Sequence, residues 1–537
     1  MDGEIQSNPA WSCKKFLYVN GRKIPLVIKE IETASEMREY QALTRFHYRG
    51  GNGVGRRVPL IAKIDRWNLP EVAGFVELSS SMLVNVARRK ILDAPFHDSD
   101  LNIRWKRWDL DTAKKYNNVL VRIARCVIYP ELRGLGLAVK LTNAAIEYAR
   151  ERWHIGGMRP CFIEIIAEML RYWPFVEKSG FVKVGETQGN DKRAPEVMAY
   201  LLGRKDSAQG YPKGGGGIMS MHRKHAEKIA AIRTDKEQSV GGIIKLLSKP
   251  PEKLSRKNWL LLHDIYRRKK PTYMLGLTKS ARAHLRTQTP NSPPSAKSRP
   301  PAQVPAASVR SMSVTASVKP RNSERCRRIQ EAFGIVSGIF ESKIIHDFSA
   351  DFYSGEICLI TGASGVGKSL FLEGIRRVIK NKTGARLPVG IRVDGKNEIS
   401  KARVAWLQAP PRNQSPIELL GGHHLDDAMR ILARAGLAEA QLFVRPARSM
   451  SVGQSYRLAL ALALAKKPDI VIIDEFCEPL DEYTSAAVCR KIRGAAAEGV
   501  CFLVATADAR KVQAELRPRR ILLLSANGEH KFRRGFV

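Results

Sequence analysis

The hydrophobic and polar positions of this chain alternate with two different periods. Residues 16–19 are all apolar or aromatic, residues 23–28 place Ile24, Leu26 and Ile28 at alternate positions, and Asn20 and Gly21 stand between the two runs. A period of two predicts strands, and an Asn-Gly pair between two strands predicts a hairpin. Residues 30–45 then repeat their apolar positions at helical spacing. Strand and helix patterns in succession predict an α/β fold for this part of the chain.

Two later stretches combine a strand, a glycine-containing turn and a helix. In the first, an apolar strand at 119–127 leads through glycines into a helix at 139–153, and a further strand follows at 161–167. In the second, the apolar run 356–361 precedes a glycine loop, and helical spacing starts at Leu370. We therefore expect an α/β domain toward each end of the chain.

Changes in composition divide the chain into four parts. Residues 1–205 predict the first α/β domain, and residues 321–537 predict the second. Residues 206–280 open with a glycine run and continue as basic helical segments. Residues 281–320 are rich in Pro, Ser and Ala and hold few large apolar side chains. Such a segment buries too little surface to offset its chain entropy, so we expect a linker there.

The glycine loop after residue 361 carries a phosphate-binding sequence. Residues 362–369 read Gly-Ala-Ser-Gly-Val-Gly-Lys-Ser, a full match to the P-loop pattern. The backbone N–H groups of such a loop wrap phosphates at the positive end of a helix dipole. Lys368 is expected to reach the β- and γ-phosphates of ATP, and the Ser369 hydroxyl to bind Mg²⁺. The expected nucleotide-binding residues are Gly362, Ser364, Gly365, Gly367, Lys368 and Ser369.

An acidic motif further along the chain adds to the expected nucleotide site. The apolar segment 469–473 is followed directly by Asp474 and Glu475. An aspartate at the end of a buried strand is placed to hold Mg²⁺ through water, and the adjacent glutamate to polarise an attacking water. We expect Asp474 to be a metal-binding residue and Glu475 to be a catalytic residue.

The C-terminal part resembles the ATP-binding cassette (ABC) family. The family signature Leu-Ser-Gly-Gly-Gln is matched by residues 450–454, which read Met-Ser-Val-Gly-Gln. The resemblance implies that Ser451, Gly453 and Gln454 contact ATP. In this family two cassettes sandwich the nucleotide, so a chain with one cassette is expected to form a homodimer or to join a partner cassette.

The same resemblance implies three further positions around the nucleotide. Gln408 matches the Q-loop glutamine, with a catalytic and metal-contacting role, and Asp481 matches the D-loop aspartate. The family places a switch histidine after the last core strand, where this chain has Ala507. This departure predicts slow hydrolysis of ATP, unless a neighbour such as Asp508 compensates.

Residues 133–138 place an arginine and two glycines at the start of a predicted helix. They read Arg-Gly-Leu-Gly-Leu-Ala, and such glycines let the backbone approach a pyrophosphate at the positive end of the helix. The sequence resembles motif A of the GNAT acetyltransferases, which implies binding of acetyl-CoA. The residues that match the motif are Arg133, Gly134, Gly136 and Ala138.

The resemblance also suggests residues for acyl transfer. Many GNAT enzymes carry a tyrosine general acid at the position that Val176 occupies here, and Tyr172 lies one helical turn earlier. Tyr172 is a candidate general acid or a packed aromatic. Glu164 and Glu168 are candidate general bases, or carboxylates that only form ion pairs. Residues 197–202 are expected to form the seventh strand of this domain.

The charge of the chain suggests an anionic partner. Lys and Arg number 90 and Asp and Glu 52, so the formal net charge is +38. Nucleic acid is the simplest such partner. Residues 104–108, Arg-Trp-Lys-Arg-Trp, are expected either to stack on unpaired bases or to cap the hydrophobic core with their tryptophans. The basic runs 222–225 and 266–270 are expected to contact phosphates without reading base sequence.

The remaining composition points to a cytoplasmic protein. No apolar run approaches the length that spans a bilayer, and the N-terminus is acidic without an apolar signal region. The eight cysteines are scattered and include no C-x-x-C pair, which favours reduced thiols over disulfides or a zinc site.

Three functional hypotheses follow. The order of the parts resembles a family of ABC ATPases fused to a predicted acetyltransferase domain. The first hypothesis is an ATPase joined to an acyltransferase that acts on nucleic acid or on a nucleic-acid-associated substrate. The second is a nucleic-acid-binding ATP switch whose GNAT-like domain only binds its ligand. The third is the ATP-binding subunit of a transporter.

Overall fold

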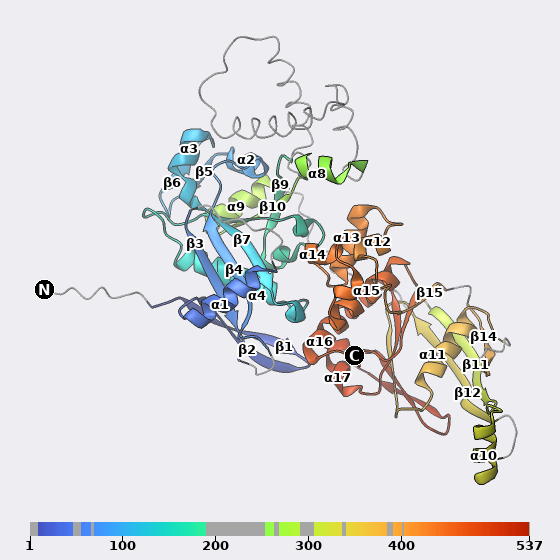
Figure 1. Cartoon of the computed structure of the whole chain (residues 1–537). Helices are drawn as coiled ribbons and strands as arrows, with labels where there is room; N and C mark the ends of the chain where they lie inside the picture. The colour runs from blue at the N-terminus through green and yellow to red at the C-terminus, as the bar shows by residue number, and fades with distance from the viewer. Residues whose placement is uncertain are drawn as a thin grey trace.

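The computed structural model describes residues 9–46, 55–65, 69–189, 253–262, 268–289, 305–335, 340–383, 390–399 and 402–535. Figure 1 shows an N-terminal part, coloured blue to green, beside a C-terminal part coloured yellow to red. The fold is mixed α/β in both parts, as the alternation of strand and helix patterns predicted.

An eight-stranded sheet forms the N-terminal part, with strand order β1-β2-β3-β4-β7-β8-β10-β9. Its strands are β1 (Ser12–Val19), β2 (Arg22–Glu30), β3 (Arg57–Lys63), β4 (Val72–Ser80), β7 (Leu120–Ile128), β8 (Phe162–Ile166), β9 (Val182–Glu186) and β10 (Pro271–Gly276). The predicted hairpin is confirmed, because β1 and β2 pair across Asn20 and Gly21, which have φ angles of 50° and 77°. Among the described strands of this sheet, only β7 and β8 are parallel neighbours.

The helices of this part cover the sheet and close its core. They are α1 (Ala34–Thr44), α2 (Val86–Leu92), α3 (Leu110–Lys115), α4 (Leu137–Glu151), α8 (Arg256–Leu262) and α9 (Lys279–Gln288), with a small hairpin of β5 (Phe96–Asp98) and β6 (Ile103–Trp105). The long helix α4 connects the parallel strands β7 and β8, and it packs on β4 and β7. Its buried face carries Leu137, Leu141 and Tyr148.

The N-terminal sheet takes one strand from the region that was expected to be a separate helical segment. Strand β10 lies between β8 and β9 and pairs antiparallel with both. Tyr273 and Met274 of this strand are buried, so their apolar surface joins the core of the first domain. The expected boundary at residue 205 is therefore wrong, and the domain extends at least to Gln288. The seventh strand predicted at 197–202 lies outside the described residues.

The predicted linker at 281–320 is wrong over the residues that the structure describes, and residues 290–304 lie outside them. Helix α9 covers its first residues, and strand β11 (Pro305–Val318) covers much of the rest. Small and medium apolar side chains alternate along β11, and Val309, Met312 and Val314 are fully buried. This period-two pattern was overlooked because the overall Pro, Ser and Ala content dominates the segment.

Two sheets build the C-terminal part. A six-stranded sheet has the order β15-β16-β17-β13-β18-β19, and a three-stranded antiparallel sheet has the order β12-β11-β14. The strands are β12 (Phe340–Tyr353), β13 (Ile357–Thr361), β14 (Ile391–Asn397), β15 (Val404–Trp406), β16 (Ile470–Ile473), β17 (Cys501–Ala505), β18 (Arg520–Leu524) and β19 (His530–Arg534). The first five strands of the larger sheet run parallel, and β19 is antiparallel.

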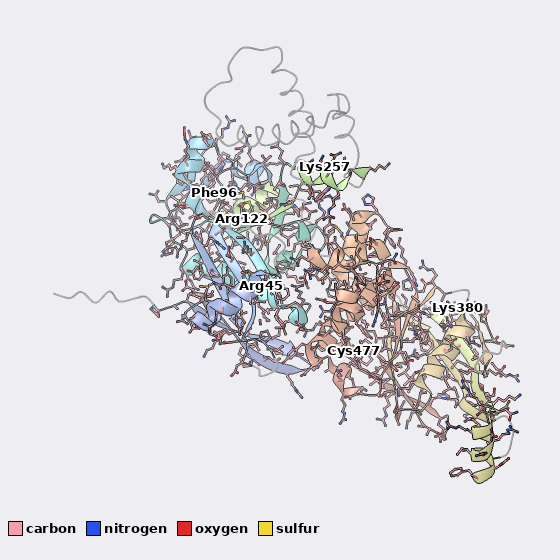
Figure 2. The ribbon with its side chains drawn as sticks, viewed as in Figure 1. Arg45, Phe96, Arg122, Lys257, Lys380 and Cys477 are labelled. Carbon is pink, nitrogen blue, oxygen red and sulfur yellow. The ribbon has the colours of Figure 1, made fainter. Side chains whose placement is uncertain are left out.

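Helices complete the C-terminal part on both sides of the larger sheet. They are α10 (Glu324–Ala332), α11 (Lys368–Ile379), α12 (Pro416–Leu419), α13 (Leu425–Arg434), α14 (Ala440–Phe443), α15 (Val452–Ala465), α16 (Glu482–Ala497) and α17 (Arg510–Leu516). Helix α11 contributes to a core shared by both sheets. Figure 2 labels Lys380 at the end of α11 and Cys477 in the interior, where Cys477 is fully buried. In the described residues no helix is long and apolar enough to cross a lipid bilayer.

Helix α16 joins the two parts of the molecule. Tyr483, Ala486 and Ala487 on its first turns belong to the hydrophobic core of the N-terminal domain. Farther along, Arg490 donates a hydrogen bond of 2.9 Å from Nη1 to the backbone oxygen of Leu135. The position of α16 between the two parts is visible in Figure 1. The N-terminal domain and the C-terminal part therefore share one packed interface.

We predict that a larger side chain at Ala487 destabilises the protein. Ala487 is 1% exposed, and a Cβ atom added at Gly134 would lie 3.2 Å from the Cβ atom of Ala487. There is therefore no room for extra atoms at Ala487. Ala487→Leu should lower the free energy of unfolding by about 1–3 kcal/mol, measured by denaturant titration. The control is Ala497→Leu at an exposed site of the same helix, which should change it by less than about 0.5 kcal/mol. Equal effects of the two substitutions would contradict the packing described for α16.

Candidate nucleotide site and candidate ligand cavity

The P-loop, Gln408 and the pair Asp474 and Glu475 meet at one edge of the larger sheet, whereas Ser451, Gly453, Gln454 and Asp481 line a separate recess. Strands β15, β16, β17 and β13 are parallel, so their carboxyl ends lie on the same side. The P-loop follows β13, the pair Asp474 and Glu475 follows β16, and Gln408 follows β15 after one residue. Crevices beyond the carboxyl ends of parallel strands are the usual ligand sites of such sheets. The topology therefore brings together residues that are up to 113 positions apart in the chain.

The P-loop has the backbone shape of a phosphate cradle. Gly362, Gly365 and Gly367 have φ angles of +156°, +80° and +95°, a region that side chains rarely allow. A Cβ atom at Gly362 would lie 2.5 Å from the backbone oxygen of Leu524, and one at Gly367 would clash with Ile344. Close packing and left-handed backbone therefore both require glycine here. Helix α11 begins at Lys368, so its free N–H groups face the loop.

Lys368 forms hydrogen bonds to the backbone of the P-loop itself. Its ammonium donates to the backbone oxygens of Gly362 at 3.0 Å and Ala363 at 2.9 Å. Ser364 and Ser369 are exposed beside it. A lysine held across the loop mouth, next to a serine hydroxyl, fits the β- and γ-phosphates of ATP and their magnesium ion.

The acidic pair after β16 is held in an unusual backbone. Glu475 has a φ angle of +48°, which is strained for a residue with a side chain, and it is exposed. The Asp474 carboxylate accepts a hydrogen bond of 3.0 Å from the Glu475 N–H. Ser369 and Asp474 provide one hydroxyl and one carboxylate, a sparse donor set that fits Mg²⁺, since this ion keeps several waters.

The signature motif forms the start of helix α15. Ser451 is its N-cap: its hydroxyl accepts from the Gln454 N–H at 3.3 Å, while the Gln454 side chain accepts from the Ser451 N–H at 3.1 Å. A Cβ atom at Gly453 would lie 2.6 Å from the Thr484 side chain, so only glycine lets α15 approach α16 this closely. Asp481 caps α16 in the same way, because its carboxylate accepts from the N–H groups of Tyr483 and Thr484.

The residues around the expected switch position form hydrogen bonds with neighbouring residues. The Ala507 N–H donates a hydrogen bond of 3.0 Å to the Glu478 carboxylate. Asp508, named above as the alternative to the missing histidine, accepts at 3.1 Å from the Arg510 N–H. Asp508 therefore caps the following turn.

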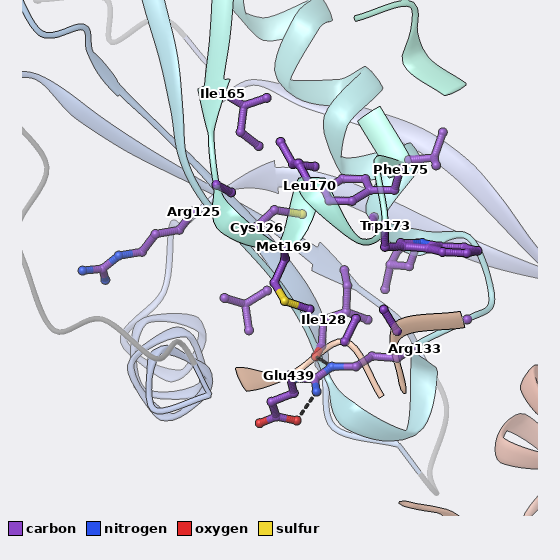
Figure 3. A pocket seen from close by; sticks show the side chains of 18 of the residues that line it. Arg125, Cys126, Ile128, Arg133, Ile165, Met169, Leu170, Trp173, Phe175 and Glu439 are labelled. Atoms are coloured by element: carbon purple, nitrogen blue, oxygen red, sulfur yellow. Dashed lines mark hydrogen bonds and ion pairs between the residues drawn. The ribbon is translucent and has the colours of Figure 1, made fainter. Parts of the chain in front are cut away.

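A cavity of about 330 Å³ lies beside the glycine-rich turn of the N-terminal domain (Figure 3). It opens where two strands separate: β7 pairs with β8 only as far as Ile123 and Ile165, although β7 continues to Ile128. Residues 124–128 of β7 line the cavity on one side, and Gly134, Gly136 and Ala138 line it at the start of α4. The two glycines have φ angles of +95° and +90°. The structure thus brings the four residues of the predicted pyrophosphate motif to one cavity.

Arg133 is engaged by the C-terminal part. Its Nε donates to the backbone oxygen of Ile128 at 3.0 Å, and its Nη1 forms an ion pair with the Glu439 carboxylate (Figure 3). Glu439 precedes helix α14 and is 8% exposed, so this pair is largely withdrawn from water. No local signal in the sequence predicts a contact between residues 306 positions apart.

Lys491 of helix α16 also lines the cavity. Its ammonium lies 3.9 Å from the centre of the Trp173 ring, a cation–π contact. Burial lowers the pKa of Lys491 to about 8, and the nearby Arg457, Lys178 and Arg434 add to this effect. Lys491 and Glu439 were both missed by sequence reasoning, because neither belongs to a motif.

Glu164 lies away from the cavity that was expected to hold the acyl donor. It is fully buried, and its carboxylate forms an ion pair of 2.7 Å with Arg88, which is 1% exposed. The Ser81 hydroxyl donates to the same oxygen. The second carboxylate oxygen of Glu164 is buried without a hydrogen-bond partner in the described residues, and the side chain does not line the cavity. Its placement argues against the predicted role as a general base. Glu168, the other candidate, is paired with Arg171 at 3.3 Å.

Tyr172 likewise does not line the cavity. Its side chain is 3% exposed, and its hydroxyl lies 3.2 Å from the Asp426 carboxylate of helix α13 and 3.3 Å from that of Glu168. Burial raises the pKa of Tyr172 to about 12, and the two carboxylates add to this effect. Tyr172 therefore anchors the domain contact, and the packed-aromatic alternative is favoured over a general acid.

The two tryptophans of the basic aromatic strip at 104–108 pack in the core, and its three cationic residues are exposed. Trp105 is 4% exposed, and its indole N–H donates to the backbone oxygen of Leu92 at 2.9 Å. Trp108 packs against it with ring centres 4.9 Å apart. This arrangement supports the expectation that the tryptophans cap the core and excludes Trp105 as a platform for base stacking. The basic run 222–225 lies outside the described residues, as do residues 266 and 267.

Comparison with known proteins agrees with the C-terminal site. The sequence profile of the ABC transporter family matches residues 345–478. The lipoprotein-releasing system ATP-binding protein LolD 1 of Caulobacter vibrioides is 30% identical over 214 residues, which cover 35% of this chain and 87% of that protein. The histidine/lysine/arginine/ornithine transport ATP-binding protein HisP of Salmonella typhimurium is 28% identical over 192 residues, which cover 30% of this chain and 74% of that protein.

Solved structures show a related similarity. A dimeric ATP-binding cassette in a post-hydrolysis state, bound to ADP and phosphate, is 18% identical and has a TM-score of 0.32, with 43% of this chain and 100% of that chain covered. The match of residues 345–478 and the similarity to LolD 1 show that, through its C-terminal part, this chain belongs to the ABC transporter family.

Proposed function

We propose that this chain is a slow ATP-driven switch whose N-terminal domain binds an acyl-coenzyme A. The carrying observation is that the cavity between the separated strands β7 and β8 meets the glycine-rich start of α4 and borders the ATP-binding part. The cassette binds and hydrolyses ATP. The N-terminal domain binds the acyl-coenzyme A, and the cassette can respond to that binding.

The cassette binds ATP and Mg²⁺, as its family does. Lys368 and the N–H groups of the P-loop hold the phosphates, Ser369 and Asp474 hold the metal, and Glu475 is positioned to polarise water. Mg²⁺ held by Ser369 and Asp474 would supply positive charge beside the phosphates of ATP. We propose slow turnover because Ala507 brings no imidazole to the γ-phosphate and the Asp508 carboxylate already caps the turn that follows.

Support for an acyl-coenzyme A ligand comes from three features of the cavity. Beyond Ile123, strand β7 no longer pairs with β8. The backbone N–H and C=O groups on that side of β7 can therefore form hydrogen bonds with the amides of a pantetheine arm. The start of α4 offers N–H groups to a pyrophosphate. The cavity volume of about 330 Å³ lies in the range of small-molecule sites. The motif that resembles GNAT enzymes lies at this same place.

Binding is better supported than acyl transfer. Glu164 and Tyr172 are buried in polar contacts of their own, outside the cavity. A second candidate function is transfer of the acyl group to an amine of a nucleic acid or an associated protein, for which the formal net charge of +38 is the supporting observation.

A third candidate is an ATP-binding subunit of a transport system. It is favoured by the names of the relatives, which are ATP-binding proteins of lipoprotein release and of amino-acid transport. This candidate gives no role to the N-terminal domain, so we rank it below the switch. Co-purification of the chain with a membrane protein would reverse that order.

We propose that the switch acts as a homodimer of cassettes. Ser451 is exposed and free to face the P-loop of a second copy. Pro130 and Glu131 of the N-terminal domain line the same recess as Ser451 and Asp481. Closure of the dimer would therefore bring the N-terminal domain next to the partner's nucleotide, which couples the two activities.

We predict that Lys368→Ala reduces the ATPase rate on the order of 100-fold, because the phosphates lose a preorganised cation. The matched control is Lys380→Ala at the exposed end of the same helix, which should keep the native rate. The rate of phosphate release at saturating ATP and Mg²⁺ measures both. Similar rates for the native chain and Lys368→Ala would contradict the assignment of the P-loop.

We predict that Gly136→Val abolishes binding of coenzyme A, measured by titration calorimetry. Gly136 has a φ of +90°, which a β-branched residue cannot adopt without strain, and the new side chain would stand at the start of α4. Gly157→Val is the control, because Gly157 has a φ of +76° and open space around it, but lies outside the cavity. No heat for coenzyme A with the native chain would refute the proposed ligand.

We predict that single-turnover mixing with radiolabelled acetyl-coenzyme A leaves no label on RNA, DNA or protein. The reason is that no described carboxylate or tyrosine hydroxyl assigned to acyl transfer reaches the cavity. The acceptors are resolved by electrophoresis, with a known acetyltransferase as the positive control. A labelled acceptor would favour the acyltransferase candidate over the binding module.

A further inference from the structure

The cavity beside residues 133–138 has walls from both parts of the chain. On one side stand β7, β8 and the start of α4. On the other stand residues of the ABC part, namely Ala433, Gly436, Ala438, Glu439, Ala440 and Lys491. A ligand that fills this cavity must touch both.

The charges around the cavity are strongly unbalanced. Its described lining holds the basic residues Arg122, Arg133, Lys178 and Lys491 and one acidic residue, Glu439, while Arg125 also lines it but directs its guanidinium away from the cavity (Figure 3). A concave site lined by charges of one sign concentrates ligands of the opposite sign. The unbalanced charge therefore favours an anionic ligand over a neutral one.

Arg133 is positioned to bind a ligand phosphate in place of the Glu439 carboxylate. The hydrogen bond from its Nε to the Ile128 backbone oxygen fixes the guanidinium at the cavity wall, and the Nη1 edge faces Glu439. A phosphate can replace a carboxylate on a guanidinium, because both accept the same paired N–H groups. Glu439 would then lose its partner in a largely buried place, which makes it a competitor of the ligand.

Lys491 adds a second cation on the opposite wall. Among the described residues it has a cation–π contact with Trp173, and no carboxylate lies within ion-pair distance. Arg457 is nearby, since a Cβ atom at Gly436 would lie 3.4 Å from both the Arg457 and the Lys491 side chains. Lys491 and Arg457 repel each other, because both are cationic and the site is partly shielded from water. An anionic ligand in the cavity relieves that repulsion.

We propose that Arg133 and Lys491 together hold the phosphates of the acyl carrier, and that the ligand displaces Glu439 from Arg133 as it binds. The ligand class is a nucleotide-linked acyl thioester of the coenzyme A type. This inference rests on the proposed function of the N-terminal domain and adds a residue of the cassette to its site. Ligand binding thus breaks an ion pair between the two parts and replaces it with a bridge through phosphate.

The test is titration calorimetry of the full chain with coenzyme A and, as a probe without phosphates, with pantetheine. Lys491→Gln should weaken coenzyme A binding about tenfold, the effect of one charge-assisted hydrogen bond, and leave pantetheine binding unchanged. Glu439→Gln should tighten coenzyme A binding several-fold, because the competitor has lost its charge. Lys531→Gln, the same change at an exposed strand position, should bind like the native chain.

The outcomes separate this inference from the proposed function. If the native chain binds coenzyme A and Lys491→Gln binds it equally well, the shared site is overturned and the acyl-coenzyme A function stands. If the native chain does not bind coenzyme A, the proposed function fails, and the inference fails with it. Weaker binding by Glu439→Gln would overturn the competitor role. Loss of pantetheine binding by Lys491→Gln would show damage to the cavity and overturn the role of Lys491 as a phosphate ligand.

Discussion

Burial of helix α16 on two faces is the interaction on which the arrangement of the molecule depends. Tyr483, Ala486 and Ala487 enter the N-terminal core, while Val488, Cys489 and Ile492 enter the core of the C-terminal part. A helix that is apolar on both sides must be covered on both sides. Apolar packing therefore holds the two parts in one relative position. The polar contacts of Arg490, Arg133 and Tyr172 fix the details of that position.

This packing connects the two sites through a single helix. Asp481 caps α16 beside the nucleotide-binding residues, and Lys491 lines the ligand cavity between two and three turns later. A rigid helix transmits displacement between its ends, so a shift of the D-loop reaches the cavity wall without any intermediate segment. If both ligands bind as proposed, coupling of this kind would be reciprocal, because each ligand would change the affinity of the other by the same factor.

The cassette was predictable from sequence because its chemistry depends on short contiguous motifs. Glycines at 362, 365 and 367 and the acids at 474 and 475 follow buried strands, and the strand pattern was plain. The cavity was predictable only at residues 133–138. Glu439 and Lys491 reach it through tertiary packing, which leaves no local signal. Glu164 and Tyr172 looked available because sequence does not show that Arg88 and Asp426 would occupy them. The boundary at 205 failed because β10 comes from a distant segment.

The place of β10 in the sheet has a consequence for how the chain is built. Strand β9 has β10 as its one neighbour in the described sheet, and the backbone N–H of Thr187 donates to the oxygen of Lys270 where the two strands begin and end. During synthesis, β9 emerges first and waits for about 80 further residues before its partner exists. The β9 edge of the N-terminal sheet can thus pair only after β10 has been made, and closing this long loop is entropically costly. Translation reaches the cassette only afterwards, so the wall that α16 packs against is complete when α16 arrives.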